Sequence, residues 1–137
     1  MTTRFLSSAF VALAALMAVW VAPINAHHSF AAEFDASKPV TIKGVVTQIE
    51  WKNPHVWFYV NVKDEEGRMT RWACEMGAPH QLQGRGWLRD TMKIGDVVTV
   101  EGSLARDGSN RANARTVTTA DGKTLGAASS GDPTTRP

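Results

Sequence analysis

The sequence predicts a mainly β fold, an OB-fold-like small barrel of five strands with a short helix between the third and fourth strands. Several short runs place an apolar residue at every second position, which is the period of a half-buried strand. Turns that contain glycine or proline separate these runs. One segment, between the third and fourth runs, lacks the alternation. We therefore predict an OB-like domain over residues 40–126.

The first predicted strand is the run 40–51, which is rich in β-branched residues. Its pattern changes phase after Gly44. A glycine at a phase change indicates a bulge or a sharp bend, as expected of a strand that turns between the two sides of a small barrel. The apolar positions that define the two phases are Val40 and Ile42 before the glycine and Val45, Ile49 and Trp51 after it.

The second and third strands form a predicted hairpin. Residues 55–63 alternate most clearly, and the loop 64–67 ends at a glycine suited to a left-handed conformation. The strand 68–76 then returns along the first one. The predicted core faces carry Val56, Phe58, Val60 and Val62 on one strand and Thr70, Trp72, Cys74 and Met76 on the other.

The remaining elements of the domain are predicted from residues that favour turns, helix starts and strands. Pro79 can open a helix at its first turn, so we predict about one helical turn over residues 80–83. Strands are predicted over residues 97–104 and 115–120, and residues 121–123 turn into a short final extension. Residues 127–137 are small, polar and proline-bearing, which is typical of a disordered tail.

The N-terminal 26 residues have the layout of a signal peptide. One positive charge, at Arg4, precedes an uncharged and largely apolar stretch over residues 5–21. Pro23 then breaks the helix, and Ala26 provides a small residue for cleavage. The other interpretation is an uncleaved anchor, because the stretch approaches the roughly 20 residues that span a bilayer. We expect cleavage, location in the periplasm or secretion, and no stable membrane anchor afterwards.

Charge and cysteine content limit the classes of partner and the covalent bonds that we expect of this domain. Without Arg4, fourteen basic residues remain against 13 acidic residues, so the domain is nearly neutral. Nucleic acid is not an expected partner, because its binding depends on clustered lysine and arginine. The single cysteine, Cys74, cannot form an internal disulfide. Since it alternates with Trp72 and Met76, we predict a buried, inert thiol.

Five stretches of the sequence together span nearly the whole domain after the leader. They are residues 27–35 (HHSFAAEFD), 44–55 (GVVTQIEWKNPH), 86–90 (GWLRD), 95–102 (GDVVTVEG) and 107–115 (DGSNRANAR). These stretches resemble an uncharacterised family of exported bacterial proteins, domain of unknown function 6152. The resemblance implies an exported protein but no catalytic residues, because none are established for that family.

The face of the second and third strands opposite the core is the leading candidate site. It carries His55, Trp57 and Tyr59, and pairing of the hairpin would bring Arg71 and Glu75 opposite them. OB barrels use this face to bind oligosaccharides or oligonucleotides, and aromatic residues stack on such ligands. The alternative is that Phe30 and Phe34, in an N-terminal arm over residues 27–39, cover the aromatic residues and form a second small core.

A metal site is the second hypothesis. Cleavage after Ala26 would expose His27, whose amine and imidazole can chelate one ion, and a further imidazole from His28, His55 or His80 could complete the site. Such a nitrogen-rich site suits copper or zinc.

No nucleophile motif such as Gly-x-Ser-x-Gly occurs in the sequence. We therefore predict an exported binding or accessory module without catalysis of its own. Its partner would be a small ligand or another protein, and the alternative is a periplasmic protein that binds copper or zinc.

Overall fold

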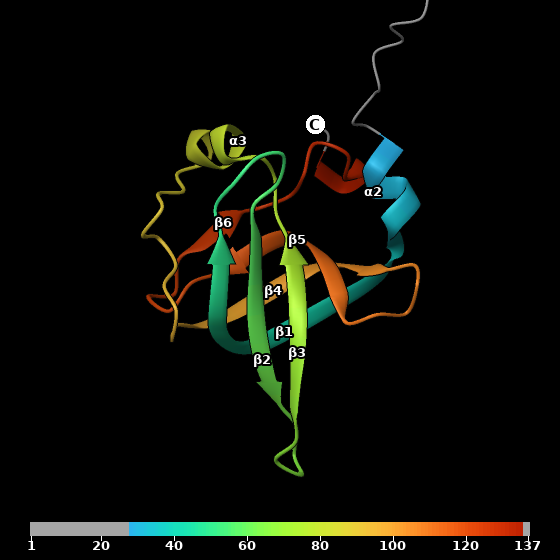
Figure 1. The fold of residues 1–137 in the computed structure, drawn as a ribbon. Helices are drawn as coiled ribbons and strands as arrows, with labels where there is room; N and C mark the ends of the chain where they lie inside the picture. The colour runs from blue at the N-terminus through green and yellow to red at the C-terminus, as the bar shows by residue number, and fades with distance from the viewer. Residues whose placement is uncertain (1–27, 136–137) are drawn as a thin grey trace, which may run out of the picture.

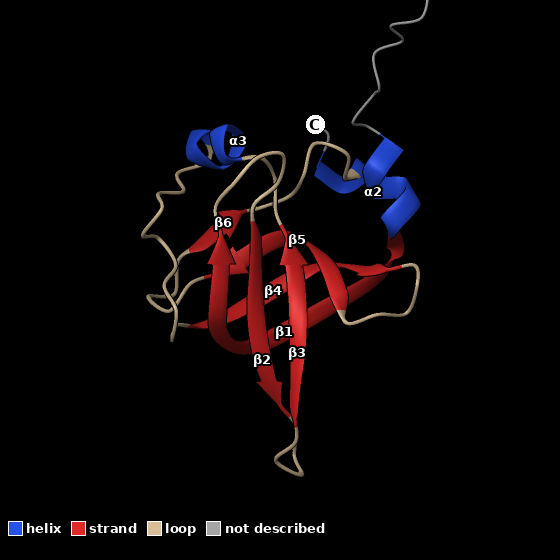
Figure 2. Cartoon of the chain, viewed as in Figure 1, coloured by secondary structure: helices blue, strands red, loops and turns tan. Residues whose placement is uncertain are grey.

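The computed structural model of the chain describes residues 28–135 and is built mainly of strands (Figures 1 and 2). The expected signal peptide, residues 1–26, and His27 lie outside the described residues. In chain order the elements are α2 (His28–Glu33), β1 (Phe34–Glu50), β2 (Trp57–Lys63), β3 (Met69–Glu75), α3 (Pro79–Gly84), β4 (Val97–Ala105), β5 (Arg111–Thr118), β6 (Thr124–Gly126) and the 3-10 turn η1 (Pro133–Thr135).

Hydrogen bonds join five of the strands into a ring. The sheet has the order β3-β2-β1-β4-β5-β6, with antiparallel neighbours throughout. A parallel pairing of Ala73–Glu75 in β3 with Arg111–Asn113 in β5 joins the two sides of the sheet. The mainly β class and the short helix between the third and fourth strands are thus confirmed. β6 adds a sixth strand, where the sequence predicted a short extension.

The long strand β1 belongs to both sides of the ring. It pairs with β4 from Phe34 to Val45 and with β2 from Val45 to Glu50. The register shifts between Val46 and Gln48, three residues later than the predicted change of phase at Gly44. The prediction that Val45 faces the core is wrong, because Val45 is 39% exposed whereas Val46 is buried.

Gly44 has a different role from the predicted bulge. A Cβ atom at this position would lie 2.5 Å from the carbonyl oxygen of Asn61 in β2. Real Cβ atoms do not approach a backbone oxygen so closely. The glycine therefore allows β1 and β2 to come together at the point where β1 passes from one partner strand to the other.

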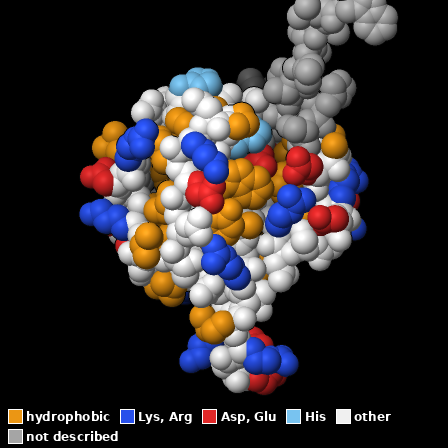
Figure 3. Space-filling model, viewed as in Figure 1, with side chains coloured by type: hydrophobic (Ala, Val, Ile, Leu, Met, Phe, Trp, Pro, Cys, Tyr) orange, Lys and Arg blue, Asp and Glu red, His pale blue; other side chains and the backbone are white. Residues whose placement is uncertain are grey.

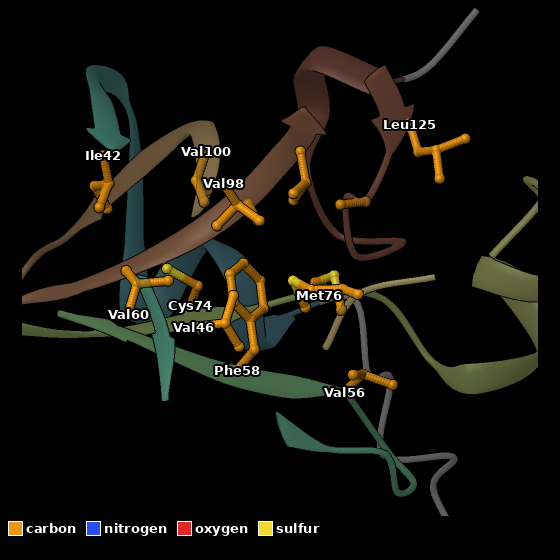
Figure 4. Packing of buried hydrophobic residues seen from close by; sticks show 14 of the residues in the cluster. Ile42, Val46, Val56, Phe58, Val60, Cys74, Met76, Val98, Val100 and Leu125 are labelled. Atoms are coloured by element: carbon orange, nitrogen blue, oxygen red, sulfur yellow. The ribbon is translucent and has the colours of Figure 1, made fainter. Parts of the chain in front are cut away.

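The interior of the ring is apolar (Figure 4). Alternate residues of β2 point into it, as predicted, and Val56, Phe58 and Val60 have no exposed surface. Cys74 and Met76 on β3 are equally buried, and burial raises the pKa of the Cys74 thiol to about 12. The prediction that Cys74 is buried is confirmed. Burial of each large side chain stabilises the fold by roughly 1.5–3 kcal/mol.

Helix α3 and the segment after it close one end of the core. Pro79 occupies the first turn, as predicted, and Leu82 is buried. Gln81 accepts a hydrogen bond from the Ala78 amide through its side-chain Oε1, at 3.2 Å. Trp87 is also buried, and its indole Nε1 donates to the Gly126 carbonyl at 2.8 Å. The irregular link after α3 is therefore anchored by this tryptophan.

The segment after β6 is ordered against the domain, contrary to the expectation of a disordered tail from residue 127. The Ala127 carbonyl accepts from the Gly77 amide at 2.8 Å, and the Ala128 carbonyl accepts from Arg85 at 2.6 Å. Ala127, Ala128, Ser129 and Asp132 are all buried. Small side chains let this segment pass close to the strands, and hydrogen bonds to its backbone hold it there. Its composition alone resembled that of a linker.

The N-terminal arm is also part of the domain. Residues 34–39, expected to precede the first strand, belong to β1 and pair with β4. Phe30 on α2 and Phe34 are buried with Ala105, and their rings lie 5.8 Å apart. The expectation that these two phenylalanines pack on the domain is confirmed.

Candidate functional site

Trp57 and Tyr59 lie on the outer face of β2, because alternate residues of the strand fill the core. In β3, Glu75 is the register partner of Trp57 and Ala73 is the partner of Tyr59. The small Ala73 leaves space beside the two aromatic rings. A hollow of about 420 Å³ opens there to solvent, and Figure 3 shows hydrophobic side chains surrounded by charged ones on this face. The hollow is lined by Glu50, Lys52, Trp57, Tyr59, Ala73 and Arg111.

A polar cluster surrounds Tyr59. Its hydroxyl donates to Glu50 Oε1 at 3.3 Å, and Gln48 donates to the same oxygen at 2.9 Å. Lys52 forms an ion pair with Glu50, and its hydrogen bond lowers the pKa of that carboxyl. The Arg71 guanidinium lies 4.5 Å from the centroid of the Tyr59 ring and donates to Gln48 Oε1 at 2.7 Å. Arg71 therefore covers one face of the tyrosine.

Arg111 forms the opposite rim of the hollow. It begins β5 after the tight loop 107–110, and β5 pairs with β3. Its guanidinium lies 3.4 Å from Glu33 at the end of α2 and 3.3 Å from Asp107. It is also 6.0 Å from the centroid of the Phe34 ring. Arg111 thus joins its own loop to the junction of α2 and β1, which lies 78 positions away at Glu33. Sequence reasoning missed it because no local pattern marks such a contact.

The N-terminal arm supports Trp57 from one side. Trp57 is half-buried and packs against the cluster of Phe30, Phe34 and Ala105. The alternative that the two phenylalanines cover the aromatic face is therefore correct for part of Trp57. Tyr59 does not belong to this cluster and lines the hollow instead.

A buried polar chain lies beside the hollow. His55 Nδ1 is 2.9 Å from Glu75 Oε1, an oxygen that also accepts a bond from Asn113 Nδ2 at 3.3 Å. Asn113 donates in addition to Ser129 Oγ at 3.0 Å. The hydrogen bond to Glu75 raises the pKa of His55, burial opposes this shift, and the charges of Glu75 and Glu33 add to it. This chain connects β2, β3 and β5 with the C-terminal segment.

The five predicted ligand-binding residues lie on one side of the hairpin, but only some of them line the hollow. Trp57 and Tyr59 line the hollow, and Arg71 stands on the tyrosine ring. His55 and Glu75 do not line it, because they pair with each other below the surface. The sequence analysis missed Glu50, Lys52, Ala73 and Arg111 as lining residues. The change of phase in β1 could have indicated Glu50, since it places this residue beside Tyr59.

The predicted metal ligands lie mostly outside the described part of the chain. His27 is not described, and only the backbone of His28 is, at the start of α2. The Nδ1 atom of His55 is committed to Glu75. Among the side chains that the structure describes, which exclude His28, no three or more His, Cys, Asp or Glu residues form a group that could hold a metal ion. The metal hypothesis, which depends on a free N-terminal histidine, stays a prediction.

Fold and site together define a small β protein with an aromatic hollow on the outside of a ring of strands. Residues 14–114 match the model of a family of unknown function, DUF6152, and the chain belongs to that family, as the sequence resemblance indicated. No curated protein and no solved structure matches the chain. Among the residues described, neither helix is long and apolar enough to cross a membrane.

Proposed function

We propose that this chain is an exported, non-catalytic binding module that holds a small ligand, or a segment of a partner protein, in the hollow on the outer face of β2 and β3. Its ring of strands would be an OB-type barrel. The strand order around the ring and the helix between β3 and β4 support this assignment. The signal-peptide layout of residues 1–26 supports export to the periplasm or the medium.

The observation that carries the proposal is the hollow itself. Its volume of about 420 Å³ falls within the range of about 300–1,000 Å³ typical of ligand sites. A second hollow, lined by residues including Asp90, Lys93, Ala120 and Asp121, has only about 170 Å³. The larger hollow also combines aromatic side chains with a few polar groups, which is the usual composition of a binding site.

Two properties favour binding over catalysis or nucleic-acid recognition. The hydrogen-bonded pair of His55 and Glu75 beside the hollow is tied into a buried chain and does not line the space. Glu50, which does line it, is held in an ion pair with Lys52. The domain after the leader is nearly neutral, so it lacks the basic surface that phosphate backbones require.

The test is a screen of a diverse small-molecule and peptide library by NMR on the isotope-labelled chain. We expect hits to shift amide signals of residues lining the hollow. Ala73→Leu, which places a larger side chain in the hollow, should abolish binding. Ala120→Leu, the same change in the smaller hollow, should leave it intact. Hits that map to the smaller hollow, or binding unchanged by Ala73→Leu, would contradict the proposal.

A further inference from the structure

We infer that the ligand class of this hollow is a neutral saccharide, a ring compound with several uncharged hydroxyl groups. This inference rests on the proposed function, since it names what the same site binds. Three features carry it: the balance of charge around the hollow, the mixture of donors and acceptors on its rim, and the support behind Trp57.

The charges around the hollow cancel. Three cations and three carboxylates line it or contact its lining residues. Lys52 is paired with Glu50, and Arg111 is held between two carboxylates. An anionic ligand at Lys52 or Arg111 would have to displace one of these carboxylates, and a charged ligand of either sign would gain little from the balanced charges. A ligand without charge meets no such cost. The six groups are Lys52, Arg71, Arg111, Glu33, Glu50 and Asp107.

The rim offers both kinds of hydrogen-bonding group. Lys52 and Arg111 carry only donors, Glu50 carries only acceptors, and the Tyr59 hydroxyl can do either. A wholly apolar ligand would bury these groups without partners, which is unfavourable. Hydroxyl groups each donate and accept, so a polyhydroxyl ring can satisfy charged donors and carboxylate acceptors at the same time. Hydrogen bonds to charged groups are also the stronger ones.

Trp57 provides the apolar surface for the ring. Arg71 occupies one face of Tyr59, which leaves the indole as the main aromatic surface in the hollow. The electron-rich face of an indole attracts the positively polarised C–H bonds of a saturated ring. Trp57 packs against the buried cluster of Phe30, Phe34 and Ala105, and this contact restrains the indole. A platform fixed before binding loses little conformational entropy when the ligand arrives.

The experiment compares three panels of soluble oligosaccharides by NMR titration of the labelled full chain. The neutral probes are hexamers of glucose in two linkages and of N-acetylglucosamine, the acidic probe is a galacturonic acid hexamer, and the basic probe is a glucosamine hexamer. We expect at least one neutral probe to shift the amides of Trp57, Ala73 and Arg111. Its affinity should change little when salt is raised about tenfold, because no net charge is neutralised.

Matched variants identify the surface. Trp57→Ala should weaken binding of the neutral probe about tenfold, the equivalent of roughly 1.4 kcal/mol. Since Trp57 also packs on the arm, Ala73→Leu serves as a second variant that removes space and keeps the indole, and it should abolish binding. Ala120→Leu should change nothing.

The outcomes separate the inference from the proposed function. Binding of only the acidic or basic probe at the hollow would overturn the neutral saccharide and leave the binding module standing. Library compounds or peptides that bind there while every saccharide fails would do the same. If neither saccharides nor library compounds shift the residues of the hollow, both proposals fall.

Discussion

Neighbouring residues of β2 lie in two very different environments. Phe58 points into the ring, has no exposed surface and belongs to the buried hydrophobic cluster of the core. Tyr59 points outward, donates to Glu50 and carries the Arg71 guanidinium on its ring. One strand thus supplies both the core and the candidate site because its side chains alternate. Because only the inward-pointing side chains fill the core, we expect substitutions on the outer face to preserve the fold and truncations on the inner face to weaken it.

The largest expected effect comes from truncation on the inner face. Phe58→Ala should lower the free energy of unfolding by about 3–5 kcal/mol, because it removes a fully buried ring and leaves a cavity. Tyr59→Ala should cost less than about 1.5 kcal/mol, since the side chain is half-exposed and its bonds are to surface groups. Urea denaturation of both variants measures the difference. Equal losses would show that the outer face is part of the core.

The second prediction concerns a point where two strands approach closely. A Cβ atom at Gly102 in β4 would lie 2.1 Å from the carbonyl oxygen of Asn113 in β5. Gly102→Ala should therefore lower the free energy of unfolding by about 1–3 kcal/mol or prevent folding, since the strands must separate. Because Asn113 also bonds to Glu75, the variant should disturb the polar chain beside the hollow.

Gly84→Ala is the matched control for this variant. The same added atom at Gly84, at the end of α3, would meet nothing within 4 Å. Its effect on stability should stay within about 0.5 kcal/mol. Thermal unfolding of the two variants side by side tests the contrast, and comparable losses would contradict the role given to Gly102.

The sequence could predict most of the fold because the core faces follow a local period. Val56, Phe58 and Val60 identify β2 from alternation alone, and Pro79 marks the start of α3. The long-range features had no local signal. The parallel pairing of β3 with β5 joins residues almost 40 positions apart, and the register shift in β1 lies at Thr47 rather than at the conspicuous glycine. The local pattern therefore predicted correctly which side chains of β2 point into the core, but it wrongly predicted that Val45 does so.

The candidate site was predictable only in part for the same reason. Trp57 and Tyr59 were found because they share one face of a regular strand. Arg111 reaches the hollow from the first position of β5, and its position depends on that parallel pairing. The C-terminal segment was misjudged because small residues such as Ala127 are typical of linkers, although here they permit close approach to the strands.

The third prediction concerns the pH dependence of stability that arises from His55 and Glu75, at the buried end of the outer face of the hairpin. His55 precedes β2 and pairs with the buried Glu75, and this hydrogen bond raises the pKa of the histidine above its ordinary value of 6.5. The pair stabilises the fold fully below that value. The contribution is lost as the pH rises through the higher pKa of the folded state. Because His55 is partly exposed, we expect the loss to be at most about 1 kcal/mol.

Chemical unfolding between about pH 5.5 and pH 9 measures this loss, and His55→Gln tests its origin. Glutamine retains a donor for Glu75 but cannot acquire charge, so the variant should lack the part of the pH dependence that belongs to this residue. Glu33 is the other carboxylate that acts on His55, and Glu33→Gln should reduce the dependence only slightly, because its effect on the histidine is smaller than that of the hydrogen bond. A wild-type profile that matches His55→Gln across the range would show that the pKa of His55 is the same in the folded and unfolded states. The positive charge of His55 would then add nothing to the free energy of unfolding, and hydrogen bonds alone would hold the buried chain beside the outer face.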